Sequence, residues 1–154
     1  MIKRTVLFLI ALLLLLSLFS CNKTLVAEEL LEDFLYVYGV SGVVYSPSAR
    51  EWEDGYAGDG LMQKIYVYDG EFPQNYALLL NSRADRSVEA AVFVCDSEYE
   101  CTRVMEMCLE RLKLISGDSS EAYIYRSSNI IFYSTFDDDG AVEDAWIKII
   151  KSHT

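Results

Sequence analysis

The chain has 154 residues and a formal net charge of −11; 52% of its residues are hydrophobic and 24% are charged. A hydrophobic content this high excludes a wholly disordered protein, and the length suits one domain. A sequence pI of about 4.4 argues against nucleic acid as a partner, because phosphate groups are bound by Lys and Arg.

The first twenty residues have the pattern of a secretory signal peptide. Lys3 and Arg4 form a short basic start, and residues 5–19 (TVLFLIALLLLLSLF) carry no charge. This apolar run is shorter than the roughly 20 residues that a transmembrane helix needs, and polar residues follow it directly. We therefore predict a lipoprotein signal peptide over residues 1–20, which is removed from the mature protein.

The end of this segment, Leu18-Phe19-Ser20-Cys21, resembles the lipobox of bacterial lipoproteins. The resemblance implies cleavage before Cys21 and a diacylglycerol thioether, with palmitate-type chains, on its thiol. Two chains are needed because a single chain, at about 0.8 kcal/mol per buried CH₂, anchors a protein only marginally. Ordinary secretion and an uncleaved anchor are the alternatives. We expect residues 21–23 to be a tether and 24–154 to be a single extracytoplasmic domain. The mature chain from Cys21 onward would have a net charge of −13.

Hydrophobic spacing predicts the first elements of that domain. Apolar residues recur every three or four positions from Ala27 to Tyr38, which predicts an amphipathic helix with Thr24 as a possible N-cap and Gly39 as its end. Residues 40–60 are rich in Gly and Ser and are expected to be irregular. Residues 61–68 form an element whose type stays open, and turns follow at residues 69–70 and at Pro73.

Two hairpins and two further helices are expected next. We predict strands over residues 75–81, 88–95, 121–126 and 130–136. Ser97 and Glu100 form a capping box for a helix that ends at residues 116–117, and the last helix begins at Asp138 or Asp139. This order predicts an α+β fold, in which a mainly antiparallel sheet of about four strands packs with three helices.

Both faces of the predicted sheet are apolar. A sheet with one face in water would alternate between apolar and polar residues, so we expect helices to cover both faces. A recognition surface on the aromatic face is the alternative. Alternation along the strands assigns Tyr76, Leu78, Leu80, Phe93, Tyr123, Tyr125 and Phe132 to that face, and Ala77, Leu79, Val92, Val94, Ile124, Ile131 and Tyr133 to the other.

No catalytic residue, metal site or cofactor is predicted. His153 is the only histidine and lies next to the C-terminus, so the usual general base and zinc ligand are missing from the body of the chain. The acidic run at residues 137–139 suggests a calcium loop, but Thr135 and Trp146 would then stand where Asp and Glu are required. We interpret this run as an acidic helix N-terminus.

Cys95, Cys101 and Cys108 leave two interpretations open. Cys101 and Cys108 are seven residues apart on one predicted helix, about 10 Å along its axis, which is too far for a disulfide. Cys95 and Cys101 could pair in an oxidising exterior. Otherwise all three are small buried hydrophobic residues.

Aromatic residues supply the candidate binding positions. Trp52 and Tyr56 lie in an acidic, Gly-rich loop that could bind a sugar, a peptide or a cationic group, although aromatic residues that cap the core would give the same pattern. With the sheet-face alternative, the ligand-binding candidates are Trp52, Tyr56, Tyr123 and Tyr125. Residues 83 and 86, both Arg, form a small basic spot that we interpret as a solvated hairpin.

The layout as a whole resembles a family of small bacterial lipid-anchored lipoproteins, found in Gram-positive spore-forming anaerobes, whose C-terminal domain has no assigned function. The shared features are the lipobox at Cys21, the strand at residues 90–95 (AAVFVC), the helix after it, and the strand pair within residues 122–135. Here Cys and Met replace many of the Lys and Ala residues of the family's helix. The resemblance implies no catalytic residues.

The sequence thus predicts a non-enzymatic binding domain, anchored to the extracytoplasmic face of the cell membrane through acyl chains on Cys21. An envelope protein or a cell-wall component is the expected partner. Two alternatives stay open: a carboxylate-dependent envelope enzyme such as a glycosidase, and a structural or regulatory subunit of an envelope complex that uses the aromatic sheet face.

Overall fold

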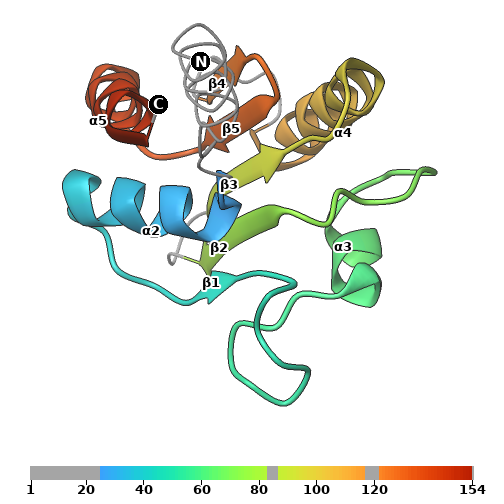
Figure 1. The fold of residues 1–154 in the computed structure, drawn as a ribbon. Helices are drawn as coiled ribbons and strands as arrows, with labels where there is room; N and C mark the ends of the chain where they lie inside the picture. Colours follow the sequence, from blue (N-terminus) through green and yellow to red (C-terminus); the bar gives the residue numbers. More distant parts are fainter. Residues whose placement is uncertain (1–24, 83–86, 117–121, 154) are drawn as a thin grey trace, which may run out of the picture.

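The computed structural model describes residues 25–82, 87–116 and 122–153; the signal peptide, Cys21, Arg83 and Arg86 lie outside these ranges. The described chain forms a five-stranded sheet with helices on both sides (Figure 1). The elements are α2 (Ala27–Tyr38), β1 (Val44–Tyr45), α3 (Asp59–Ile65), β2 (Tyr76–Ser82), β3 (Ser87–Val94), α4 (Glu98–Ser116), β4 (Tyr123–Ser127), β5 (Ile130–Ser134) and α5 (Asp139–His153).

The sheet has the strand order β1-β2-β3-β5-β4, and every neighbouring pair is antiparallel. The predicted α+β class is therefore confirmed, and both predicted hairpins form. Among the described residues the structure adds the short strand β1. The element of open type expected at residues 61–68 is the helix α3, which begins and ends slightly earlier. None of the described helices has the length and apolar content needed to cross a membrane.

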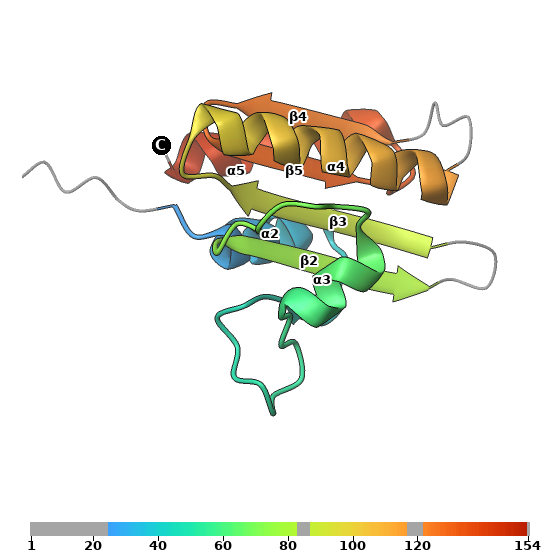
Figure 2. The same cartoon turned by 90° about the vertical axis from the view of Figure 1, so that its right-hand side faces the viewer.

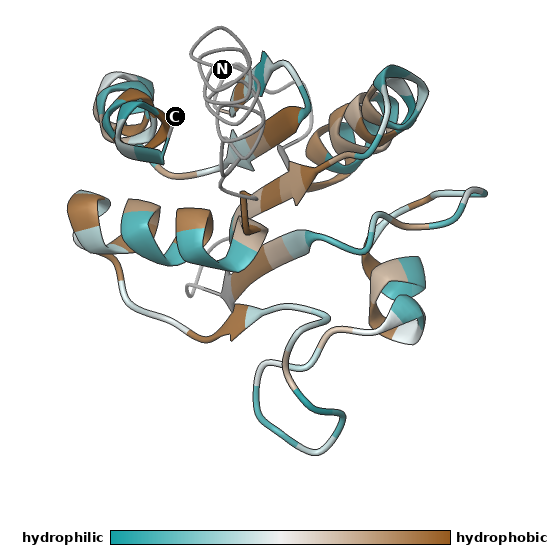
Figure 3. Ribbon diagram, viewed as in Figure 1, coloured by the Kyte–Doolittle hydropathy of each residue, from teal (hydrophilic) through white to brown (hydrophobic). Residues whose placement is uncertain are grey.

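Helices cover both faces of the sheet, as expected. One face packs against α2 and α5 in a core that includes Phe34, Phe132 and Trp146. The opposite face packs against α3 and α4 around Phe93 and Tyr133. The two layers are seen edge-on in Figure 1 and from the α3–α4 side in Figure 2. In Figure 3 the strands are largely brown, whereas the loop that hangs below β1 is mainly teal and white.

The predicted division of residues between the two faces is wrong for the second hairpin. In the β3–β5 register Val92 lies opposite Phe132 and Ala91 opposite Tyr133. Directly paired residues share a face of the sheet, so Phe132, Tyr123 and Tyr125 join the α2–α5 core, while residues 124, 131 and 133 face α3 and α4. Alternation within a strand cannot reveal this register between distant strands.

An asparagine side chain holds the start of α2; Thr24, the predicted N-cap, lies outside the described residues. The N-cap is Val26, whose side chain makes no capping bond. Asn75, just before β2, accepts a hydrogen bond from the Ala27 N–H at 2.8 Å and donates one to the Leu25 carbonyl at 2.7 Å. It therefore satisfies one of the N–H groups that a helix start leaves unpaired.

Three other helix ends agree with the predictions made from the sequence. Gly39 ends α2 in the left-handed conformation at φ +83°. Ser97 Oγ accepts the Glu100 N–H at 3.1 Å, which confirms the capping box. Asp138 Oδ1 accepts the Ala141 N–H at 3.0 Å at the start of α5, so this part of the acidic run acts as a helix cap.

An ion pair between a buried glutamate and a half-buried arginine joins α4 to the sheet. Glu89 on β3 is only 3% exposed, and its carboxylate accepts hydrogen bonds from the Arg111 Nε, at 3.1 Å, and from the Arg111 Nη2. Tyr133 donates its hydroxyl to Glu89 Oε2 at 3.4 Å, and the Tyr66 and Tyr133 hydroxyl oxygens are 2.7 Å apart. Burial raises the pKa of both tyrosines, so both hydroxyls stay protonated and able to donate.

Candidate functional site

Residues 46–57 leave the end of β1 and return to it, so that the two ends of the loop lie side by side. Ser46 donates its N–H to the Gly55 carbonyl at 2.8 Å, and Ala57 donates its N–H to the Ser46 carbonyl at 3.0 Å. The buried Tyr76 hydroxyl donates to the Ala57 carbonyl at 2.8 Å. The segment is therefore an Ω-loop, a class of compact loop that often carries function.

Gly55 allows this closure. Its φ is +94°, a conformation that side chains rarely adopt, and an added Cβ would lie only 2.6 Å from the Val44 carbonyl oxygen. The returning end of the Ω-loop can therefore pass this close to β1 only because residue 55 is glycine.

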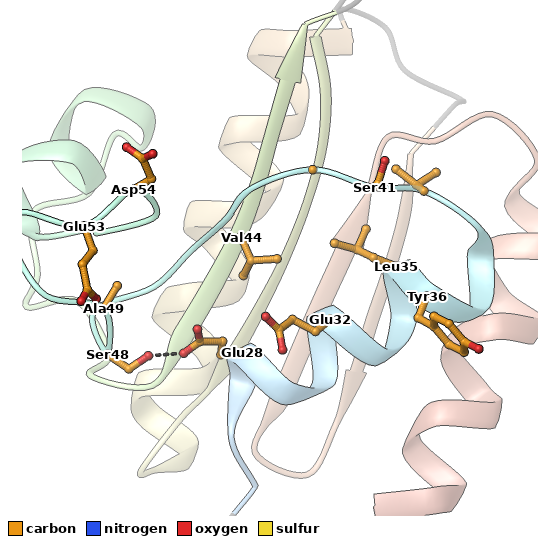
Figure 4. A pocket seen from close by; sticks show the side chains of 12 residues that line it. Glu28, Glu32, Leu35, Tyr36, Ser41, Val44, Ser48, Ala49, Glu53 and Asp54 are labelled. Carbon is orange, nitrogen blue, oxygen red and sulfur yellow. Dashed lines mark hydrogen bonds between the residues drawn. The ribbon is translucent and has the colours of Figure 1, made fainter.

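Glu28 links the Ω-loop to α2. Its Oε2 accepts a hydrogen bond from the buried Ser46 Oγ at 2.9 Å and another from Ser48 Oγ. The two serine oxygens are 2.6 Å apart. Figure 4 shows the hydrogen bond between Ser48 and Glu28. Two hydroxyl donors to one carboxylate are a strong arrangement, since hydrogen bonds to charged groups are shorter and stronger than neutral ones.

A groove of about 750 Å³ lies between α2 and the Ω-loop. From α2 it is lined by Glu28, Glu32 and Tyr36, which recur every four residues and therefore share one side of the helix. Four acidic side chains, four aliphatic ones, a tyrosine and small polar residues make up the lining (Figure 4): Glu28, Glu32, Leu35, Tyr36, Val40, Ser41, Gly42, Val44, Ser48, Ala49, Glu53 and Asp54.

The groove is electrostatically negative. Four carboxylates line it, and the described lining includes no Lys or Arg. Arg50 lies beside it on the loop, with its Nε 3.9 Å from Glu53 Oε1, but both groups are well exposed and such a pair is weak. Tyr36, which is 86% exposed, adds an aromatic surface. Carboxylates together with an exposed aromatic ring are suited to ammonium or guanidinium groups.

The predicted aromatic candidates do not form one site. Trp52 lies on the Ω-loop, 78% exposed, with the Arg50 guanidinium 5.8 Å from its ring centre. Tyr56 is half-buried, and neither residue is part of the groove lining. Tyr123 and Tyr125 are on β4, at the opposite edge of the sheet, which four strand spacings place roughly 19 Å away.

Tyr123 and Tyr125 contribute to packing. Tyr125 meets Trp146 edge-on with ring centres 6.1 Å apart, and the ring centre of Tyr123 is 6.0 Å from that of Phe132. Both tyrosines are half-buried against the core beneath α5. The aromatic surface that the sequence suggested is therefore largely covered within the molecule.

The three described cysteines are free and buried. The predicted alternative of a Cys95–Cys101 disulfide is wrong, and the interpretation as small buried residues is confirmed. Cys101 Sγ is 3.6 Å from the Ser128 carbonyl oxygen, to which it donates a weak hydrogen bond. Burial raises the pKa of Cys95 and Cys108, which keeps these thiols protonated and makes them poor nucleophiles.

Two further features of the sequence are the C-terminal histidine and the candidate metal ligands. His153 Nε2 is 2.8 Å from Asp33 Oδ2, so the histidine joins the end of α5 to α2. Within the described ranges, no three His, Cys, Asp or Glu side chains come together as a set of metal ligands.

The residues of α2 that line the groove were missed by the sequence interpretation. The spacing of Glu28, Glu32 and Tyr36 was visible, but a polar stripe on an amphipathic helix is normally its solvent face. Comparison with known proteins adds no further guide: no family model, no curated protein and no solved structure matches this chain.

Proposed function

We propose that this chain is a lipid-anchored extracytoplasmic binding protein that holds a positively charged ligand in the groove between α2 and the Ω-loop. The anchor is the acylated Cys21, after removal of residues 1–20, as in the small lipoproteins of Gram-positive spore-forming anaerobes that the sequence resembles. The binding role is non-enzymatic. The observation that carries the ligand class is the groove itself, with four carboxylates and no described basic residue in its lining.

The spacing of the acidic residues favours an extended basic peptide segment. Glu28 and Glu32 are one helical turn apart, about 6 Å along the axis of α2. In an extended chain, alternate side chains point the same way and are about 6.6–6.8 Å apart. Basic residues at alternate positions of such a segment would therefore meet Glu28 and Glu32 in turn, and a third would reach the ring of Tyr36.

An extended ligand also suits the size of the groove. The stretch of α2 from Glu28 to Tyr36 rises about 12 Å, so a volume of about 750 Å³ corresponds to a mean width of roughly 9 Å. An α-helix with its side chains is about 10–12 Å wide. Five extended residues match this length, since their four steps of about 3.3 Å span about 13 Å.

A glycosidase is less well supported than a binding protein. Such an enzyme needs one carboxyl group kept protonated by an apolar, water-poor surrounding. Glu32, Glu53 and Asp54 are all exposed to solvent, and Glu28 already accepts two hydroxyl groups. Exposed carboxylates favour attraction of a cation over proton transfer.

Fluorescence anisotropy with a labelled Lys-x-Lys-x-Lys peptide tests the ligand class. The double variant Glu32→Gln/Asp54→Asn removes two groove charges, each worth up to about 1 kcal/mol, so we expect the Kd to rise about tenfold. The matched control Glu29→Gln/Glu143→Gln removes two charges outside the groove and should change the Kd less than twofold. Equal weakening in both variants would reject the groove as the site.

The anchor is tested separately. Cys21→Ser should abolish labelling by a fatty-acid analogue, because the thiol that would carry the diacylglycerol thioether is removed. Asn22→Ala, which alters the adjacent residue and keeps the thiol, is the control and should stay acylated. Continued labelling of the Cys21→Ser protein by the fatty-acid analogue would contradict acylation at Cys21.

A further inference from the structure

A short tether connects the proposed anchor to the folded domain. Only residues 22–24 separate Cys21 from Leu25, the first described residue, which already packs against the α2–α5 core. The four Cα steps from Cys21 to Leu25 span at most about 14 Å even when fully extended. The acyl chains therefore hold the domain close to the bilayer.

The first residues of the domain cannot extend the tether. Asn75 binds the Leu25 carbonyl and the Ala27 N–H at 2.7 and 2.8 Å. The Asn75 carbonyl in turn accepts the Val94 N–H at 2.9 Å, which ties this point to the end of β3. Residues 25–27 are thus fixed to two central strands and cannot unwind to lengthen the tether without breaking these bonds.

One end of the groove lies close to the tether along the chain. Glu28 lies in the first turn of α2, so the chain path from Cys21 to Glu28 is at most about 22 Å. A compact domain of this length is roughly 35 Å across. Glu28 therefore lies within about 22 Å of the bilayer, which is less than the width of the domain. From Glu28 the groove runs along α2 toward Tyr36, as Figure 4 shows.

The exposure of the groove also limits its affinity. Glu32, Glu53 and Asp54 are exposed, and ion pairs in water are weak and screened by salt. A weak site is filled when its ligand is confined to the same surface, because shared anchoring raises the effective concentration to the millimolar range without any new contact. A dilute soluble peptide lacks this advantage.

Resting on the proposed function, we infer that the partner is an integral membrane protein of the same bilayer, and that the groove binds an extended, basic juxtamembrane segment of that protein. Membrane proteins carry most of their Lys and Arg on the cytoplasmic side. Basic juxtamembrane segments on the outer side are correspondingly few, so the acidic groove selects a small class of partners.

Reconstitution in vesicles of zwitterionic lipid tests this inference, because such lipid does not itself attract basic peptides. The lipidated protein is mixed either with a transmembrane peptide that displays Lys-x-Lys-x-Lys next to the bilayer or with the same segment free in solution, and binding is followed by energy transfer. We expect the membrane-anchored probe to half-saturate the protein at a concentration at least tenfold lower than the free probe.

A tether variant is the decisive comparison. Inserting 20 Gly and Ser residues between Lys23 and Thr24 adds a root-mean-square length of about 25 Å. We expect this insertion to weaken binding of the anchored probe several-fold and to leave the free probe unchanged. Equal binding of the two probes, or no effect of tether length, would overturn the inference.

The same experiment separates this inference from the proposed function. If the free probe binds the wild-type protein but binds the Glu32→Gln/Asp54→Asn variant about tenfold more weakly, the groove is the cation site whatever the effect of the tether. If the free probe binds both proteins equally, the proposed function fails and the membrane-partner inference fails with it.

Discussion

Carboxylates serve different purposes in two regions of this protein, beneath α4 and beside α2. Glu89 is buried, and Arg111 and Tyr133 use its acceptor capacity. Glu32 and Asp54 line a groove and face solvent. Burial makes an unpaired charge costly, so the first carboxylate is tied to internal partners, whereas the exposed ones remain available to an external cation. The comparison separates acidic residues that hold the fold from those suited to binding.

The largest effect should come from removing the cation beneath α4. Arg111→Met leaves the Glu89 carboxylate buried without its cationic partner, which we expect to lower the free energy of unfolding by about 3–5 kcal/mol in urea denaturation. Lys113→Met, an exposed change on the same helix, should alter the free energy by less than about 0.5 kcal/mol. Combining Arg111→Met with Glu89→Leu should recover most of the loss. If Arg111→Met lowers the free energy of unfolding by less than about 1 kcal/mol, Glu89 does not differ from the exposed carboxylates in its structural role.

The hydroxyl groups of Tyr66 and Tyr133 provide a second test of the buried network around Glu89. Tyr133→Phe leaves the buried Tyr66 hydroxyl without its partner and should cost about 1–3 kcal/mol of unfolding free energy. Tyr66→Phe leaves the Tyr133 hydroxyl bonded to Glu89, so we expect a cost of about 1 kcal/mol or less. Denaturation of the two variants under identical conditions measures the difference. Equal costs would show that Glu89 does not hold the Tyr133 hydroxyl.

The smallest effect on stability should come from the groove. Glu32→Gln/Asp54→Asn removes two exposed charges from an acidic protein and should leave the free energy of unfolding within about 0.5 kcal/mol of wild type. A slight gain is the expected direction, because the chain has a net charge of −11. Thermal and urea denaturation beside the anisotropy titration provide the check. A loss above about 1 kcal/mol would place these carboxylates among the structural ones.

Local patterns predicted most of the elements. The helix from Ala27 to Tyr38, both hairpins and the capping box of α4 all follow from the spacing of residues close in the chain. The two-residue strand β1 has too little sequence of its own and exists through pairing with Leu78 and Leu79 on β2. The division of residues between sheet faces failed because it depends on the β3–β5 register, which is set across about 40 residues.

The wall of the groove on α2 could be predicted from the sequence, and the wall on the Ω-loop could not. The stripe of Glu28, Glu32 and Tyr36 follows from helical periodicity alone. The opposite wall depends on the return of the Ω-loop, through Gly55, and on the bonds from Ser46 and Ser48 to Glu28, which join residues 18 and 20 positions apart. The exposed Trp52 drew attention to the correct loop but not to the surface that the loop encloses.

The two hydrogen bonds from the Asn75 side chain to the start of α2 have a mechanical consequence. Any tension applied at the N-terminal end of the domain meets the two hydrogen bonds of this side chain before it reaches the hydrophobic contacts of α2. Because Asn75 continues into β2 and its carbonyl is bonded to Val94, the pull is distributed over the middle of the sheet. If the domain is anchored as proposed, a pull from the bilayer would be transmitted to its most extensively paired strands and would spare the helix that forms one wall of the groove.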